Sequence, residues 1–298
     1  MNLRQAPLQF VRGFAMGSAD IVPGVSGGTV ALVLGIYERL ISHIRFGATA
    51  LRQLVSREPR AALATVRRID WVWLGSLLVG ILTAIAALSA VIERMLTEQP
   101  VRTAAVFSGL VIGSVLVAWQ LIRSRTTLQW IVAAATAVAL FVLLGLRSDT
   151  HSTSAEIVTQ PWWVFTAAGA LAICAMILPG ISGSFILVMI GMYSEVLGAV
   201  NDRNLVAVAA TGLGCVIGLG AFSTLLDWLL RNHHDIVIAA MVGLMLGSMR
   251  VLWPWPAGTE TTTISAPSGD VAMPIVLAVV AFVVVLGVDR VARRQPTE

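Results

Sequence analysis

The stretch DIVPGVSGGTVALVLGIY, residues 20–37, interrupts a chain that otherwise consists largely of long hydrophobic runs. Its Pro-Gly and Ser-Gly-Gly segments break helices, and a broken helix exposes backbone groups that lipid cannot satisfy. A second stretch of the same kind, MILPGISGSFILVMIGMY, covers residues 176–193. These stretches decide the fold, because a membrane chain tolerates such breaks only where protein or water surrounds them.

The composition is that of a polytopic α-helical membrane protein. Of the 298 residues, 57% are hydrophobic and 12% are charged, and the mean hydropathy is +0.86. A soluble domain carries about 25% charged residues, so this chain lacks the polar surface that water requires. The 20 basic residues are all arginine and lie mainly in loops beside hydrophobic runs, which favours lipid headgroups over nucleic acid as their partners. Cys174 and Cys215 lack metal-ligand spacing, and we expect no metal and no cofactor.

Hydrophobic runs divide the chain into spans and hairpin arms. Two pairs of runs are expected to form hairpins with the Pro-Gly tips between their arms, 8–22 with 25–44 and 161–178 with 181–200. The arginine-rich segment 45–70 has apolar residues at roughly helical spacing, as in a helix on the membrane surface. Six further runs are near the 20 residues that span a bilayer as helix: 71–92, 103–122, 128–146, 205–230, 236–252 and 272–289.

The two halves of the chain are related. PGVSGGTVALVLGIY (23–37) and PGISGSFILVMIGMY (179–193) share six of fifteen positions, and GLVIGS (109–114) is echoed by GLMLGS (243–248). We therefore expect a single transmembrane domain, residues 1–298, built from repeats at about 1–150 and 160–298. The first repeat has extra residues at 45–70, which explains why the two echoes are offset by different distances.

The arginines predict the topology. If 8–44 enters and leaves on one side, every large arginine cluster falls in the cytoplasm, together with both termini. Each repeat then has a hairpin and three spans, an odd number of crossings, so the second repeat is inverted. Inverted repeats with broken helices are typical of secondary transporters. The arms 161–178 and 181–200 are long enough to cross fully, although the uncharged tips favour re-entrance.

The tips are candidate anion sites. Proline lacks an N–H and ends the first arm, and the helix after it begins with free amides and small residues, a favourable environment for an anion. Two tips that enter from opposite faces would present donors to one anionic group. The alternative is a pair of tight-packing turns whose serines bond only their own backbone. The predicted helix breaks are Pro23, Gly24, Pro179 and Gly180, and the predicted substrate ligands are Ser26, Gly27, Gly28, Thr29, Ser182, Gly183 and Ser184.

The motif GSADIVPGVSGGT (17–29), its echo PGISGS (179–184) and the Gly-Ile/Met-Tyr that follows each resemble the polyprenyl-phosphate transporter family, also called PopT. The similarity covers essentially the whole chain. It implies the return of undecaprenyl phosphate, or a similar polyprenyl phosphate, from the outer to the inner leaflet of the bacterial plasma membrane. The lipid carrier is thereby recycled for peptidoglycan and other envelope polymers. Ser184 and Phe185 replace Gly28 and Thr29 in the second repeat, so its donor geometry is expected to differ.

A lipid phosphate fits this design, since the prenyl tail can stay in lipid while only the headgroup crosses. The buried phosphate needs hydrogen bonds and positive charge. Arg12 in the first arm is the predicted cationic ligand, and Arg94 and Arg102 flank the outer loop as further candidates. Asp20, three residues before the tip, either carries a coupling proton or orients and caps the broken backbone. Glu38 and Glu195 occupy near-equivalent places past the tips and are weaker candidates.

Two other functions are open to test. A membrane lipid phosphatase would act on a similar substrate but needs a nucleophilic histidine with clustered basic residues, and the four histidines lie at span ends or in loops. We therefore expect a transporter and not an enzyme. The stronger alternative is a secondary transporter of a small soluble anion that uses the same tips. The sequence indicates neither the oligomeric state nor the coupling ion.

Overall fold

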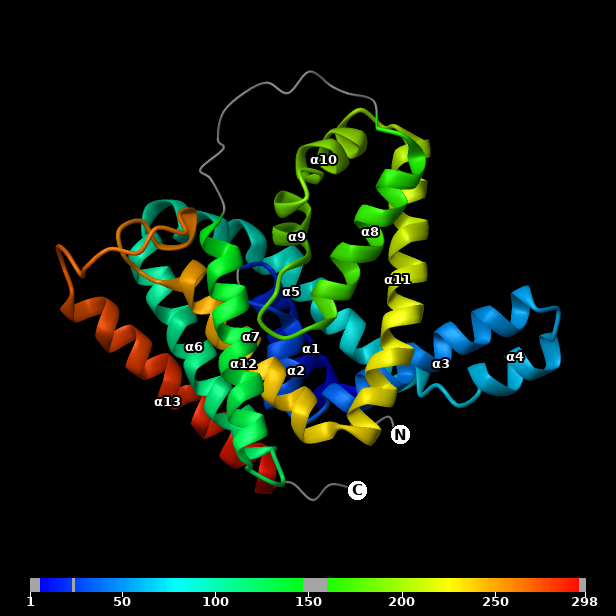
Figure 1. Ribbon diagram of the computed structural model, residues 1–298, viewed down its shortest axis with the longest axis horizontal. Helices are drawn as coiled ribbons and strands as arrows, with labels where there is room; N and C mark the ends of the chain where they lie inside the picture. Colours follow the sequence, from blue (N-terminus) through cyan, green and yellow to red (C-terminus); the bar gives the residue numbers. More distant parts are fainter. Residues whose placement is uncertain (1–5, 23–24, 147–159, 295–298) are drawn as a thin grey trace.

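The computed structural model describes residues 6–22, 25–146 and 160–294, and all regular secondary structure in them is helical (Figure 1). The all-α membrane fold is thereby confirmed. The helices are α1 (Ala6–Asp20), α2 (Gly27–Val33), α3 (Tyr37–Val55), α4 (Pro59–Val66), α5 (Trp71–Glu98), α6 (Pro100–Gln120), α7 (Thr127–Gly145), α8 (Trp162–Ile177), α9 (Gly183–Met189), α10 (Tyr193–Asn201), α11 (Leu205–Asn232), α12 (His234–Leu252), the 3-10 helix η2 (Gly258–Glu260) and α13 (Ala272–Arg294).

Six of these helices are long and apolar enough to cross a membrane, and they match the six predicted spans: α5, α6, α7, α11, α12 and α13. In the most apolar segments of α6 and α12, 61% and 56% of the residues are buried, against at most 22% in the other four. Helices α6 and α12 therefore form the centre of the bundle. The other four spans keep apolar side chains on the surface, as expected of helices that face lipid.

The two halves repeat the same helix contacts. Helix α1 packs on α5, and α8 packs on α11. A Cβ at Gly13 would lie 2.1 Å from the carbonyl oxygen of Leu77, and one at Gly169 would lie 2.3 Å from that of Thr211, so both pairs of helices cross with almost no side chain between them. Gly13 and Gly169 are 156 residues apart in the sequence, whereas Leu77 and Thr211 are 134 residues apart. The first half therefore carries 22 additional residues between its tip and its first span.

The spans of the two halves pack against each other. Helix α6 packs on α13 and α7 packs on α12, while α6 and α12 also touch. The repeated GLxxGS motif lies at these contacts, because a Cβ at Gly109 would meet the backbone of Ala278, and one at Gly243 would meet that of Ala133. The largest buried apolar cluster accordingly contains residues of both halves.

The second arm of each hairpin is broken, which corrects the prediction of continuous arms at 25–44 and 181–200. Helix α2 ends at Val33 and α3 starts at Tyr37, while α9 and α10 meet at an angle of 111°. Gly35 and Gly191 cause both breaks. They have φ of +67° and +71°, and each takes the left-handed position of the same helix-ending motif. In this motif the next residue donates its N–H to a carbonyl five residues back, Ile36 to Ala31 and Met192 to Leu187.

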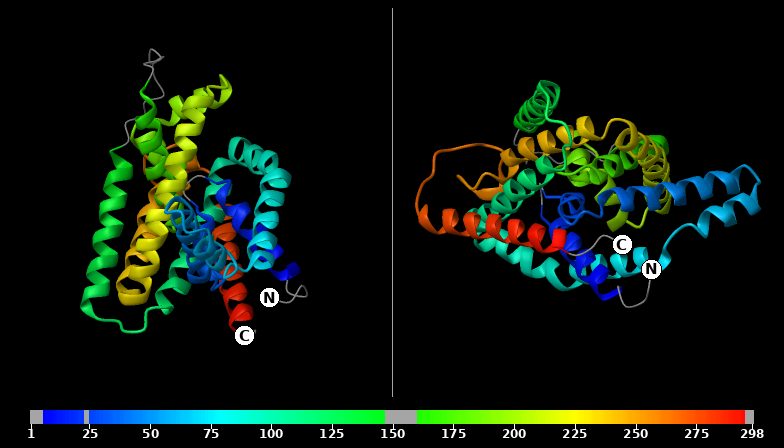
Figure 2. Two further views of the ribbon diagram at one scale, coloured as in Figure 1. Left: turned by 90° about the vertical axis from the view of Figure 1, so that its right-hand side faces the viewer. Right: turned by 90° about the horizontal axis from the view of Figure 1, so that it is seen from below.

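The arginine-rich segment forms an additional helical hairpin that leaves the bundle sideways, as Figure 1 and the right view of Figure 2 show. Its helical prediction is confirmed, but α3 starts at Tyr37, inside the hydrophobic run, and α4 is a separate helix. Asp227 of α11, 5% exposed, holds the base of α3 by accepting from Ser42 at 2.9 Å and pairing with Arg45 at 3.1 Å and Arg231 at 2.8 Å.

Candidate functional site at the hairpin tips

The first tip connects α1 to α2, and its described residues form a closed hydrogen-bond network. Pro23 and Gly24, two of the predicted helix breaks, lie outside the described residues. The Asp20 carboxylate accepts the N–H of Gly27 at 2.5 Å. The Ser26 hydroxyl accepts the N–H of Gly28 at 3.1 Å, and the Ser26 carbonyl accepts that of Thr29 at 2.8 Å. The first three amides of α2 are therefore all occupied by groups of the chain itself.

The second tip connects α8 to α9 and is less constrained. The break falls where the sequence predicts it, at Pro179 and Gly180, and Gly180 has φ of +87°. A Cβ on Gly180 would lie 2.8 Å from the Met245 backbone, so this turn rests directly on α12. Ser182 makes no capping bond to α9, and its hydroxyl lies 2.7 Å from that of Ser184, which is exposed. The polar groups of this tip therefore remain available.

The two tips touch each other. The Ser26 hydroxyl donates to the Met176 carbonyl at 3.3 Å, and the buried Tyr37 hydroxyl donates to the Ile177 carbonyl at 3.0 Å. A Cβ on Gly28 would lie 2.9 Å from the same Ile177 oxygen, so this glycine permits the approach. The last carbonyls of a helix have no partner within it, and here the first hairpin supplies partners for two of them at the end of α8.

Thr29 is the unexplained polar group of the site. Its side chain is 2% exposed, and its hydroxyl has no hydrogen-bond partner in the described part of the chain. A buried hydroxyl without a partner costs roughly 1–3 kcal/mol, so such groups are rare unless a ligand or water completes them. Thr29 is the third residue of α2 and lies in the first turn of this helix, together with Gly27 and Gly28.

The arginines and glutamates that the sequence offers as ligands lie apart from one another in the structure. Arg12 is half-buried, donates to Gln9 Oε1 at 3.3 Å, and is close enough to Arg39 for their charges to interact. It makes no hydrogen bond to the described residues of either tip. Arg94 pairs with Glu98 at 2.7 Å, and Arg102 with Asp270 at 3.2 Å. Glu38 lies 3.1 Å from the His234 Nε2 atom. Glu195 is in the first turn of α10 and only partly exposed. The structure thus brings together the small residues but none of the candidate arginines.

Two features of the site were missed from the sequence. The sequence marks Tyr37 only as a repeated residue, whereas in the structure its hydroxyl bonds the Ile177 carbonyl at the end of α8. Gly35 and Gly191 were likewise noted as repeated, and their role in ending α2 and α9 was not predicted. The signal was present, since a Gly followed by an apolar residue at the end of a short helical run favours this ending.

Comparison with known proteins identifies the family. Residues 16–269 match the model of a family described as undecaprenyl phosphate translocase-like. A polyprenyl-phosphate transporter of Vibrio cholerae is 37% identical, with 96% of each chain covered. One of Staphylococcus aureus is 28% identical, with 95% of this chain and 96% of the relative covered. No solved structure matches. With its repeated Pro-Gly tips, its six spans and this match, the chain belongs to the undecaprenyl phosphate translocase-like family.

Proposed function

We propose that this protein transports polyprenyl phosphate, with undecaprenyl phosphate the leading candidate, across the bacterial plasma membrane. It would return the lipid carrier from the outer to the inner leaflet for the synthesis of envelope polymers. The observation that carries the proposal is the contact of the first hairpin with the end of α8 through Ser26 and Tyr37. In the same part of α2 the Thr29 hydroxyl is buried and has no partner among the described residues. The family and the names of its relatives support the choice of substrate.

The phosphate would bind between the tips. Ser182 and Ser184 have accessible hydroxyls, and the helix starts supply partial positive charge where an anion would otherwise be costly. Thr29 would complete its hydrogen bonding on the substrate. Ser26, Gly27, Gly28 and Gly183 would allow the phosphate to approach the backbone once the present bonds rearrange. Arg12 would be reached by the headgroup on its path along α1.

The proposed orientation places both termini and the α3–α4 hairpin in the cytoplasm, with the two repeats inverted. In Figure 1 the ends of the chain lie at one end of the bundle, and α8 begins at the other end. The left view of Figure 2 agrees. In a cysteine-free background, a cysteine at exposed Ser56 should be shielded from an impermeant thiol reagent in intact cells, and one at exposed Ser268 should react. External labelling at position 56 would overturn this orientation.

Transport itself is tested by reconstitution. Proteoliposomes that contain the purified chain should move labelled polyprenyl phosphate between leaflets faster than protein-free liposomes, and a pH gradient shows whether protons drive the movement. Labelled inorganic phosphate tests the alternative of a small soluble anion. Uptake of the soluble ion without movement of the lipid would favour that alternative. Release of inorganic phosphate from the lipid would instead indicate an enzyme.

A further inference from the structure

The α3–α4 hairpin is the part of the chain that the proposed transport mechanism does not use. It is helical, it leaves the bundle sideways, and only the first part of α3 is held by α11 (Figure 1). Its two helices are joined by a turn in which Arg57 has φ of +61°, and Thr65 Oγ1 donates to Gln53 Oε1 at 2.8 Å between them. The hairpin is thus an ordered projection.

Its charge is strongly one-sided. Residues 45–68 contain six arginines and one acid, Glu58. Five of the arginines are exposed and have no ion pair in the described part of the chain: Arg52, Arg57, Arg60, Arg67 and Arg68. The sixth, Arg45, has its Nε atom 3.1 Å from Asp227 but makes no aligned hydrogen bond through that atom. So many uncompensated positive charges favour a partner with many negative charges.

Apolar side chains stand beside these charges. Leu51, Leu54 and Val55 are at i, i+3 and i+4 of α3, and all three are exposed, Val55 by 79%. Leu63 on α4 is exposed as well. A helix surface that combines a short apolar stripe with arginines is suited to a bilayer interface, where the apolar groups enter the acyl region and the cations meet headgroup phosphates.

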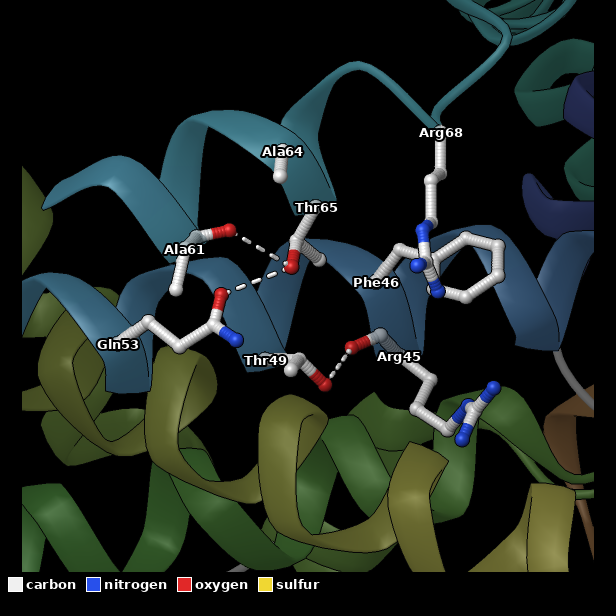
Figure 3. Close-up of a pocket in the computed structure, with 8 residues that line it drawn as sticks. All are labelled: Arg45, Phe46, Thr49, Gln53, Ala61, Ala64, Thr65 and Arg68. Carbon is white, nitrogen blue, oxygen red and sulfur yellow. Dashed lines mark hydrogen bonds between the residues drawn. The ribbon is translucent and has the colours of Figure 1, made fainter. Parts of the chain in front are cut away.

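A groove between the helices supplies a defined place for one headgroup. It has a volume of about 340 Å³ and is lined by side chains of both helices, among them Phe46, Thr49 and Ala61. Figure 3 shows Arg45 and Arg68 at the same end of the groove, near the Phe46 ring, with Gln53 and Thr65 toward the other end. Arg45 pairs with Asp227 and Thr65 already donates to Gln53 and Ala61, so the exposed Arg68 guanidinium is the cation that the groove offers to a headgroup phosphate.

We propose that the α3–α4 hairpin is a docking element for anionic phospholipid, which lies on the bilayer surface and holds a phosphatidylglycerol-type headgroup in the groove beside Arg68. The sideways projection places it along the bilayer if α11 crosses it. This inference is independent of the transported substrate, since it concerns the lipid around the protein.

The test is a depth measurement on the full chain in nanodiscs. Cys174 and Cys215 are replaced by Ala, a spin label is attached at Leu54→Cys, and collisions with oxygen and with a polar nickel chelate are compared. In discs with phosphatidylglycerol the label should be oxygen-accessible, and in phosphatidylcholine discs it should be accessible to nickel. The triple variant Arg60→Gln, Arg67→Gln, Arg68→Gln should weaken the preference for phosphatidylglycerol by about fivefold per arginine.

The matched control replaces three exposed arginines elsewhere, Arg125, Arg203 and Arg290, by Gln and should leave the depth unchanged. A label that remains accessible to nickel in phosphatidylglycerol discs would overturn the proposal. Equal burial in both lipids, unaffected by the triple variant, would overturn the role of charge. A second label at Ala64→Cys in the groove, in detergent, should respond to short-chain phosphatidylglycerol and not to inorganic phosphate. An equal response to inorganic phosphate would indicate a soluble-anion site instead.

Discussion

The two hairpin tips share a motif but differ in their surroundings. Tyr37 is 2% exposed and bonded to the opposite hairpin, whereas its equivalent Tyr193 is 43% exposed. Ser26 is 2% exposed and caps α2, whereas Ser182 is partly exposed and caps nothing. The backbone endings at Gly35 and Gly191 are nevertheless the same. Similar sequences therefore build the same turns, while the contacts between the turns make one tip closed and the other open.

In the proposed mechanism, this asymmetry corresponds to one side of a transport cycle. The closed tip has its amides filled by Asp20 and Ser26, and the open tip presents Ser182 and Ser184. If the two repeats are inverted as proposed, rocking of one repeat against the other would exchange the two environments. The following substitutions test whether the closed tip is held by the contacts described above.

The largest effect is expected from Gly27→Val. Its Cβ would lie 2.4 Å from the Asp20 carboxylate and would displace it from α2, so transport should be lost and stability should fall by about 1–3 kcal/mol. Gly183→Val should also block transport and lower stability, since its Cβ would lie 2.9 Å from the backbone oxygen of Ala172 and 3.5 Å from Met176 Cβ. Gly198→Val is the matched control, with nothing within 4 Å. Transport rates and thermal unfolding in detergent check these outcomes, and normal transport by Gly27→Val would refute the proposed role of the tip.

The second largest effect is expected at Asp20, where substitution by Asn or by Ala distinguishes a proton carrier from a cap of α2. Asp20→Asn keeps an oxygen that can accept from Gly27 and removes the charge, whereas Asp20→Ala removes both. If Asp20 carries the coupling proton, the Asn variant should bind polyprenyl phosphate but lose transport driven by a pH gradient. If it only caps α2, the Asn variant should transport normally and the Ala variant should be destabilised, by roughly 1.5–3 kcal/mol for a bond to a charged group.

Substitutions of Tyr37 and Tyr193 should differ by a smaller amount, and in stability alone. Tyr37→Phe leaves the Ile177 carbonyl without its buried donor and should lower the free energy of unfolding by about 1–3 kcal/mol. Tyr193→Phe removes a hydroxyl from an exposed side chain and should stay within about 0.5 kcal/mol. Thermal unfolding of both variants measures the difference. Equal stabilities would mean that the contact between the tips does not hold them together.

The serine substitutions should have the smallest effects. Ser26→Ala and Ser182→Ala each remove one neutral hydroxyl, worth roughly 0.5–1.5 kcal/mol, and should weaken binding of polyprenyl phosphate about two- to tenfold, with a larger loss in the double variant. Ser26→Ala should also reduce stability, because it removes the cap of α2. Gly113→Ala, at the contact of α6 with α13, controls for packing and should lower stability without a selective loss of binding. Unchanged binding in the double serine variant would place the site elsewhere.

The membrane class, the six spans, the two hairpins and the repeat can be predicted from the residues alone, because each follows from local hydropathy, helix-breaking residues or internal similarity. The sequence also predicts which small residues form the hairpin tips, since Pro, Gly and Ser have distinctive backbone effects, while their role as substrate ligands stays a prediction. These are properties of a residue and its near neighbours in the chain, so they can be read without a fold.

Which polar groups of the tips are hydrogen-bonded depends instead on the packing of distant helices. The hydroxyls of Ser26 and Tyr37 find their acceptors about 150 and 140 residues away, and no local pattern encodes a contact at that distance. The same holds for Thr29, because its burial depends on helices packed from elsewhere in the chain, and its hydroxyl finds no partner among the described residues. Hydrogen bonding at the tips depends on how the two repeats pack together, and that packing differs between two copies of nearly the same motif.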